Sequence, residues 1–379
     1  MTLSSKKVLF LESYSAAVYG AQKSMLSLAH GLQHKMNMDV VISTSREGKL
    51  SKRCKELDLE CHIYPIPSKA MRSRKDLSII EKFYLPILVF FAWFKNVSLL
   101  QSMRESDSIC VNDIRSFLYY LPFLYINKKK VIWYVRINDR IKFITGLAAR
   151  LSYKILLISS DCKGSFTEQE LSKYRGKFEV LHTGFEFHTT QNEISKTHSN
   201  NDTVFITVGS ICRRKNTLAV IEAFNRIELK DKFLYVLGSP TSQEDEKYLE
   251  EVEAFVEKAC ITSQVCFISS TPFVDQYLAF SDYFLFASHK EGLPRVLIEA
   301  LLNNCYVISS RVDGVTDIIK NDNLGLYTNS RAIEPNFKNE FDELIKKALV
   351  HEEKSDSRCF VKESFSYNAF LDGFYSFLK

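Results

Sequence analysis

The chain has 379 residues, of which 46% are hydrophobic and 25% are charged. That length exceeds one compact core and predicts two domains of roughly 150 to 200 residues each, whereas the composition excludes a disordered, collagen-like or repeat protein. A formal net charge of +5 over the whole chain argues against a nucleic-acid-binding protein.

The first half of the chain alternates short apolar runs with segments of helical spacing. We predict helices over 23–36 and 143–154, and strands over 7–13, 39–44, 108–113, 130–137, 155–160 and 178–184. Such alternation implies a parallel sheet covered on both faces, because each crossover helix packs back on the sheet. The apolar stretch before Glu12 is only four residues long, so no signal peptide is visible and we expect a cytoplasmic protein.

Two aromatic-rich segments, 69–95 and 116–130, carry lysines and arginines beside their apolar runs. The twelve uncharged residues from 83 to 94 are too few to cross a bilayer, which takes ~20 residues. Two interpretations stay open: a buried helix after a solvated basic loop, or an anchor lying on anionic lipid. The anchor would place the protein peripherally on the inner face of the cytoplasmic membrane.

A polar stretch at 189–203 reads as an exposed linker, after which the strand and helix pattern restarts. Strands are predicted at 203–210, 233–239, 264–270, 283–288 and 305–311, with helices at 217–227 and 242–259. The predicted organisation is a first domain over 1–188, the linker, a second domain over 204–360, and a final helix over 361–379 that packs on the first domain.

The cysteines and histidines of the chain do not suggest metal sites or disulfides. Its nine cysteines lack CxxC spacing and fit buried thiols in a reducing compartment. His30 and His34 have helical i, i+4 spacing but no third ligand nearby in the sequence. We therefore expect no disulfide, no metal and no cofactor.

Ligands of parallel sheets bind beyond the carboxyl ends of the strands, so the loops there hold the candidate site residues. Gly20 opens the first helix and would let backbone amides approach a phosphate, although a plain turn is the alternative. Arg213, Arg214 and Lys215 crowd the loop after the strand at 203–210. They suit either a bound diphosphate or a solvated loop.

Two glutamates, Glu291 and Glu299, frame the segment SHKEGLPRVLIEAL at 288–301. Pro294 suits the first turn of a helix, which places Glu291 at the helix entrance. Glu299 falls two turns later among apolar residues and needs a partner if it is buried. It either lies on the outer face of the helix or binds a ligand diol such as a ribose.

These segments resemble the retaining glycosyltransferases of family four. The likeness rests on EGLPRVLIEAL followed by CYVISSRVDGVTDII, on VGSICRRKNTLAVIEAF, and on KVLFLES with YGAQ, and it covers nearly the whole chain. The resemblance implies a GT-B fold, in which two Rossmann-like, doubly wound parallel-sheet domains face a central cleft.

The same resemblance implies roles for individual residues. Glu291 would contact the hydroxyls of the donor sugar, Glu299 the nucleotide ribose, and Lys215 the diphosphate. The amides of Gly292 and Leu293 would lie near the sugar and diphosphate, and Gly20 would approach the donor phosphates. Arg136 falls where many relatives carry a histidine near the acceptor, and no metal would be required.

The chain also departs from the family pattern. Ser210 stands where the family commonly has an arginine, so Arg213 or Arg214 would supply the missing charge. Asp313 replaces one of two paired glycines. These departures indicate a divergent member of the family.

The resulting hypothesis is a retaining glycosyltransferase that uses a UDP- or GDP-linked sugar and a lipid-linked, lipopolysaccharide or polysaccharide acceptor at the cytoplasmic membrane. One alternative is a transferase acting on a small soluble acceptor. The other is a catalytically silent scaffold with the same fold that binds a partner protein.

Overall fold

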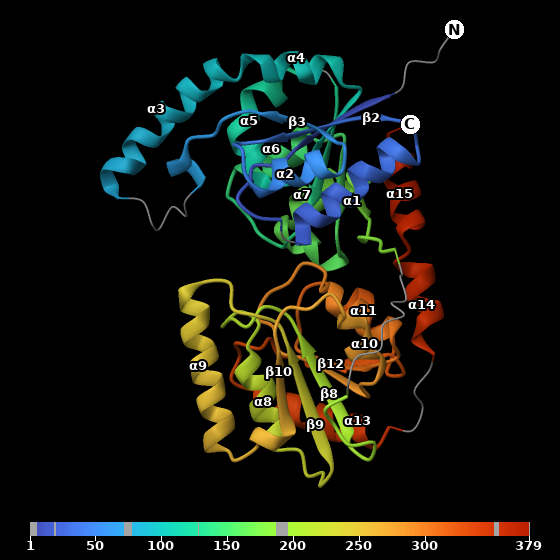
Figure 1. Cartoon of the computed structure of the whole chain (residues 1–379). Coiled ribbons are helices and arrows are strands. Elements are labelled where there is room, and N and C mark those ends of the chain that lie inside the picture. The colour runs from blue at the N-terminus through green and yellow to red at the C-terminus, as the bar shows by residue number, and fades with distance from the viewer. Residues whose placement is uncertain are drawn as a thin grey trace. The chain divides into compact units, whose positions relative to one another are not determined.

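The structure is a computed structural model, and it describes residues 6–18, 20–71, 78–127, 129–186, 196–351 and 356–378. The described chain forms two compact units (Figure 1). The first unit holds the residues up to Gly184 and those from Tyr367 onward, and the second unit runs from Phe185 to Ser366. The first part of the predicted linker, residues 189–195, lies outside the described residues.

The first unit is a seven-stranded parallel sheet with the strand order β3-β2-β1-β4-β5-β6-β7. Its strands are β1 (Lys7–Leu11), β2 (Asp39–Thr44), β3 (Glu60–Ile63), β4 (Ser108–Val111), β5 (Lys130–Val135), β6 (Lys154–Leu157) and β7 (Phe178–Val180). Its α-helices are α1 (Gly20–His34), α2 (Lys49–Glu56), α3 (Ile79–Lys95), α4 (Val97–Glu105), α5 (Ile114–Ile126), α6 (Ile144–Leu151), α7 (Glu168–Lys173) and α15 (Tyr367–Ser376).

Several strands of the first sheet, though not β2, end earlier than the sequence pattern predicted. β4 stops at Val111, although the prediction ran to Asp113. The reason is that Asp113 caps α5, because its carboxylate accepts a hydrogen bond from the Ser116 amide at 2.9 Å. The residues between a strand and its helix are therefore loop residues at the carboxyl edge of the sheet.

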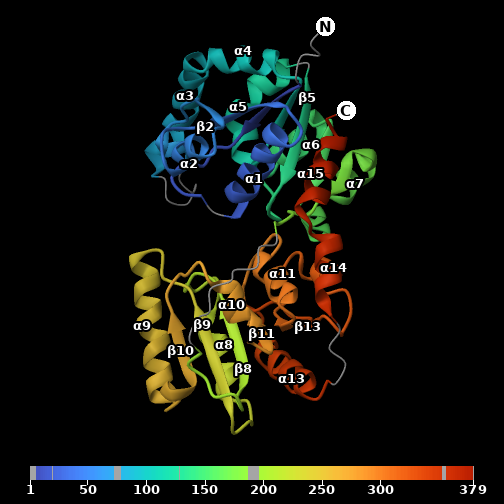
Figure 2. The same ribbon diagram turned by 45° about the vertical axis from the view of Figure 1, so that its right-hand side comes forward.

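The last helix, α15, packs on α1 within the first unit (Figure 2). The Tyr367 hydroxyl donates to the carbonyl of Ser27 at 2.8 Å, and Phe374 stacks on Phe10 with ring centroids 6.0 Å apart. A Cβ on Gly31 would collide with the Tyr367 hydroxyl. The absence of a side chain at Gly31 thus permits the close approach of the two helices.

Helix α3 carries many large apolar side chains on its surface, so the interpretation of residues 83–94 as a buried helix is wrong. Phe83 is 77% exposed and Phe94 is 63% exposed. The helix is attached to α5 by the Trp93 indole, which donates to the carbonyl of Tyr119 at 2.6 Å. Among the described residues no single helix is long and apolar enough to span a membrane, although α3 and α4, bent by 55° at their junction, pass that test as a pair.

The second unit is a six-stranded parallel sheet with the strand order β10-β9-β8-β11-β12-β13. Its strands are β8 (Thr203–Val208), β9 (Lys232–Leu237), β10 (Val265–Ile268), β11 (Tyr283–Phe286), β12 (Tyr306–Ser309) and β13 (Gly325–Tyr327). Its α-helices are α8 (Thr217–Asn225), α9 (Gln243–Lys258), α10 (Val274–Ala279), α11 (Arg295–Leu302), α12 (Val315–Ile318), α13 (Phe337–Leu349) and α14 (Ser357–Ser364).

On one face of the second sheet, side chains of β8, β9, β11 and β12 pack in a hydrophobic core cluster with α8, α9 and α13. The alternate residues of these strands, such as Ile206, Phe284 and Val307, are buried on the other face. Helices α10, α11 and α14 lie together (Figure 2). The two doubly wound parallel sheets confirm the predicted fold class, since each sheet has helices packed against its strands.

Candidate functional site

The second sheet has a topological switch point between β8 and β11, where the strand order reverses. Ligands of open α/β sheets bind in the crevice outside the carboxyl ends of the strands at such a point. The loop after β8 carries Ser210 and Arg213 to Lys215, and the loop after β11 carries Ser288 to Pro294. The fold therefore brings two of the predicted motifs to one place.

Glu291 is the centre of a cluster of charges at this switch point. Its Oε1 atom lies 2.8 Å from Lys215 Nζ and 2.9 Å from Arg214 Nη1, and it accepts a hydrogen bond from the Ser288 hydroxyl at 2.7 Å. The His289 amide donates to the carbonyl of Arg214 at 2.9 Å, which holds the two loops together. One carboxylate oxygen thus positions two cations.

The surroundings of Glu291 keep it ionised. Burial raises the pKa of this carboxyl, but Lys215, Arg214 and the Ser288 hydroxyl outweigh burial and leave the pKa below its usual value. Its side chain is only 14% exposed and that of Lys215 only 15%. A compact ion pair of this kind can exchange partners when an anion such as a diphosphate enters.

Arg213 and Arg214 point to different partners. The Nη2 atom of Arg213 lies 2.5 Å from the carboxylate of Glu251 on α9. Arg214 instead pairs with Glu291 and donates to the carbonyl of Lys290 at 3.0 Å. Ser210 lies in the same loop with its hydroxyl 3.6 Å from the sulfur of Cys212. Of the two arginines, Arg214 is the one that the structure brings to the cluster.

Glu299 lies on α11 apart from the contacts of Glu291. Its side chain is 39% exposed and faces Arg295, with 3.9 Å between Nη2 and Oε1. Partial exposure explains how a carboxylate is tolerated on this otherwise apolar helix without a close partner. Pro294 is the N-cap of α11 and so lies one residue before the helix that it was expected to begin.

The turn at Gly292 and Leu293 is covered by the loop after β12. Gly314 has φ +82°, and a Cβ there would come within 2.8 Å of the carbonyl of Gly292 and 3.0 Å of Leu293 Cα. The neighbouring Asp313 is buried, and its carboxylate accepts a hydrogen bond from Arg331 at 2.8 Å. The aspartate that replaces a glycine here is therefore paired with an arginine of the second unit.

The first unit holds the other two predicted site residues. Gly20 is the first residue of α1, and a Cβ on it would meet no atom within 4 Å, so the local packing does not require glycine there. Arg136 follows β5 and lines a cavity of about 350 Å³ at the carboxyl ends of β1, β4 and β5. Sequence reasoning missed the residues that hold Arg136 in place.

Those missed residues are Glu12 and Asn112. The Asn112 amide donates to Glu12 at 2.6 Å and accepts from Arg136 Nε at 2.9 Å. Burial, followed by the charge of Asp113, raises the pKa of Glu12 to about 8. Glu12, Asn112 and Arg136 are each the first residue after a strand, which is the sequence signal that could have identified them.

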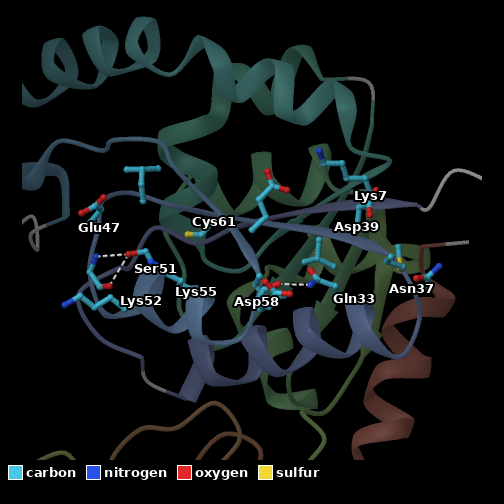
Figure 3. A pocket seen from close by; sticks show the side chains of 16 residues that line it. Lys7, Gln33, Asn37, Asp39, Glu47, Ser51, Lys52, Lys55, Asp58 and Cys61 are labelled. Atoms are coloured by element: carbon cyan, nitrogen blue, oxygen red, sulfur yellow. Dashed lines mark hydrogen bonds between the residues drawn. The ribbon is translucent and has the colours of Figure 1, made fainter.

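A wider cavity of about 1060 Å³ lies along the edge strand β3 (Figure 3). It is lined by the first residues of β1, β2 and β3 and by both lysines and acidic residues of α1, α2 and their loops. Parallel sheets place ligands at the opposite ends of the strands, and none of the predicted site residues lines this cavity. Among the described residues no group of three or more His, Cys, Asp or Glu side chains could hold a metal ion.

Comparison with known proteins finds a family whose model resembles the second unit. Residues 189–359 match the family model described as glycosyl transferases group 1. The chain is 28% identical over 46% of its length to the capsular polysaccharide biosynthesis glycosyltransferase CapH of Staphylococcus aureus, and this match spans 47% of CapH.

A second relative is the N-acetylgalactosamine-N,N'-diacetylbacillosaminyl-diphospho-undecaprenol 4-alpha-N-acetylgalactosaminyltransferase of Campylobacter jejuni, which is 24% identical over 60% of this chain and 62% of its own length. The aligned regions thus span about half to three fifths of these relatives.

Among solved structures, HepE of Anabaena in complex with UDP is similar to this chain with a TM-score of 0.75 and 15% identity over 98% of this chain and 99% of HepE. That likeness shows the fold. Residues 189–359 are thus similar to the glycosyl transferases group 1 family, and the chain has the two-domain GT-B fold.

Proposed function

We propose that this protein is a retaining glycosyltransferase that moves a sugar from a nucleotide diphosphate sugar to a lipid-linked, lipopolysaccharide or polysaccharide acceptor at the cytoplasmic membrane face. The observation that carries the proposal is the Lys215–Glu291–Arg214 cluster at the switch point of a domain similar to the glycosyl transferases group 1 family. HepE in complex with UDP, CapH and the Campylobacter transferase support a UDP-linked donor and a glycan or undecaprenol-linked acceptor.

In the proposed reaction the second unit binds the donor. Glu291 holds Lys215 and Arg214 in place and contacts the sugar hydroxyls, while the two cations offset the charge that develops on the leaving diphosphate. Preorganised charges of this kind stabilise a transition state without reorganisation, so the proposal needs no metal. The amides of Gly292 and Leu293 lie near the sugar, and Glu299 accepts hydrogen bonds from the ribose.

Retention follows from attack of the acceptor on the same face of the sugar that the diphosphate leaves. This route forms no covalent bond to the protein and needs no side-chain nucleophile. In the first unit Arg136 acts on the acceptor side, and Gly20 approaches the donor phosphates.

The test is a thermal-shift panel of UDP, GDP, ADP, CMP and their sugars with the wild type and Glu299→Ala. We expect one nucleotide, UDP first among them, to stabilise the wild type, and we expect a folded Glu299→Ala to lose most of that shift because the ribose contact is removed. Glu250→Ala on α9, which is exposed, is the matched control. A panel in which no nucleotide shifts the melting temperature would favour the catalytically silent scaffold.

The proposal includes a membrane contact through helix α3 and the end of α5. Nine large apolar residues are exposed on α3, which is more than the singly scattered apolar residues of an ordinary protein surface: Ile79, Ile80, Phe83, Tyr84, Ile87, Leu88, Phe90, Phe91 and Phe94. On α5 Tyr125 is 66% exposed and Ile126 57%. Aromatic side chains beside lysines fit the interface of an anionic bilayer. Residues 72–77 and 128 of the predicted segments lie outside the described residues.

Vesicle sedimentation tests this contact. We expect the wild type to bind phosphatidylglycerol vesicles in a salt-sensitive manner, and a Phe83→Ser/Phe91→Ser/Phe94→Ser variant to bind at least about tenfold more weakly, because burial of each side chain contributes on the order of 2 kcal/mol. Ile333→Ser, at an exposed site of the second unit, is the control. Equal binding by the triple variant, or no binding by the wild type, would favour a small soluble acceptor.

A further inference from the structure

The first sheet has its own topological switch point, between β1 and β4, and the cavity that contains Arg136 lies beside it. Glu12 follows β1, Asn112 follows β4 and Arg136 follows β5, so three neighbouring strands each contribute one polar side chain. This crevice is where an open α/β sheet binds its ligand. The cavity lies within the first unit and has no residue in common with the Glu291 cluster.

The guanidinium of Arg136 is held rigidly on three sides. Nε donates to Asn112 at 2.9 Å, Nη1 donates to the Ser24 hydroxyl at 2.8 Å, and the guanidinium carbon lies 3.5 Å from the centre of the Tyr134 ring. The remaining nitrogen, Nη2, is buried and has no hydrogen-bond partner among the described residues. A buried donor without a partner is unfavourable, and more so when it is charged.

The positive charge of Arg136 is also without a direct counter-ion. Asn112 separates it from Glu12, and the raised pKa of Glu12, about 8, leaves that carboxyl mostly protonated at neutral pH. Asp113 also lines the cavity, but its carboxylate accepts hydrogen bonds from the amide and hydroxyl of Ser13 and from those of Ser116. The other charged residues of the lining are Arg115 and Asp139, which are both exposed and carry opposite charges.

We infer that this cavity is a binding site for an oxyanion, a phosphate or a carboxylate, which accepts a hydrogen bond from Arg136 Nη2. Guanidinium groups recognise phosphate and carboxylate oxygens through charge-assisted hydrogen bonds, and an anion here would satisfy both the free N–H and the free charge. The volume of about 350 Å³ accommodates one sugar unit carrying the anionic group. That the oxyanion belongs to the acceptor rests on the proposed transfer function.

The binding site can be tested without any transfer reaction, because Trp133 lines the cavity and the chain has only one other tryptophan, Trp93. In a Trp93→Phe background the fluorescence of Trp133 reports on the cavity. Inorganic phosphate, D-glucuronate and D-glucose are titrated at constant ionic strength. The phosphate arm represents a phosphodiester or diphosphate acceptor, the glucuronate arm a uronic acid, and glucose is the neutral control.

We expect a saturable signal with phosphate or glucuronate and none with glucose. Arg136→Gln should raise the apparent Kd at least about tenfold, because a hydrogen bond to a charged partner is lost. Lys258→Gln, at an exposed site on α9 of the other unit, should leave the Kd within about twofold. If Arg136→Gln does not fold, Arg136→Lys replaces it and should also weaken binding, because one ammonium cannot keep the contacts to Asn112 and Ser24 and still reach the ligand.

The inference is overturned if neither anion gives a saturable signal, or if the Kd does not depend on Arg136. The nucleotide thermal shift, repeated with Arg136→Gln, separates this inference from the proposed function. A nucleotide shift without anion binding would overturn the oxyanion site alone. Anion binding through Arg136 without any nucleotide shift would support the site and contradict the proposed transferase.

Discussion

Each unit has a glutamate at the switch point of its sheet, and the two glutamates differ in how they contact the nearby cations. In the second unit Glu291 touches Lys215 and Arg214 directly, at 2.8 and 2.9 Å. In the first unit Glu12 reaches Arg136 only through the amide of Asn112, with 2.6 Å on one side and 2.9 Å on the other. The switch point of the second sheet thus has a direct ion pair, whereas that of the first sheet has an indirect contact through the neutral Asn112 side chain.

This difference determines the protonation of each carboxyl. Burial raises the pKa of both, but only Glu291 has cations close enough to reverse the shift. Glu291 is therefore ionised and fixes two cations, whereas Glu12 is mostly neutral and leaves Arg136 without a counter-ion. Both carboxyls are buried, so the difference lies in their partners. The cluster around Glu291 is suited to positioning cations, whereas the cluster around Arg136 is suited to binding an anion.

The largest expected effect is on the direct ion pair. Glu291→Gln should lower the turnover of the preferred nucleotide sugar by about two to three orders of magnitude. The reason is that Lys215 and Arg214 lose the group that orients them, and that the proposed contact with the sugar is weakened. The measurement is steady-state turnover, with Glu250→Gln as control. A rate within threefold of the wild type would remove Glu291 from the proposed site.

A smaller effect is expected when one cation of the cluster is removed. Arg214→Ala should lower kcat/KM for the donor about 10- to 100-fold, since a hydrogen bond to a charged group contributes about 1.5–3 kcal/mol. Arg213→Ala is the matched control and should stay within about twofold, because its partner is Glu251 on α9. Equal losses for both variants would show that Arg213 leaves Glu251 when the donor binds.

An effect of another kind, on stability and not on catalysis, is expected at the indirect contact between Glu12 and Arg136 in the first unit and appears as a change of stability with pH. The pKa of Glu12 is raised from 4.5 to about 8 in the folded protein, so between those values the folded state holds a proton that the unfolded state releases. Stability therefore falls as pH rises through this window, by at most about 5 kcal/mol. Glu12→Gln removes the titration, and its Tm relative to the wild type should rise from pH 5 to pH 8 and then level off.

Differential scanning calorimetry at pH 5, 7 and 9 measures this change. Glu250→Gln, at an exposed position of α9, serves as the control and should show no such trend. A difference in Tm between Glu12→Gln and the wild type that is the same at pH 5 and pH 9 would contradict the raised pKa of Glu12.

Much of the architecture could be read from the sequence. Apolar runs of four to six residues between helical segments predicted the central strands of both sheets, and β2 at 39–44 was placed correctly at both ends. The strands β3 (ECHI) and β13 (GLY) were missed because neither of them is an apolar run. Lys215 and Glu291 were singled out because each follows a strand, and the structure places them in contact.

The sequence by itself determined the alternation of strands and helices, and hence the fold class, because the hydrophobic period of an element is a local property. Only the tertiary structure decided the partners: Arg214 rather than Arg213 on Glu291, the exposure of α3, and the chain of contacts from Glu12 to Arg136. Asn112 lies 100 residues from Glu12 in the chain. Such contacts depend on which strands become neighbours in the sheet, and that is a property of the whole fold.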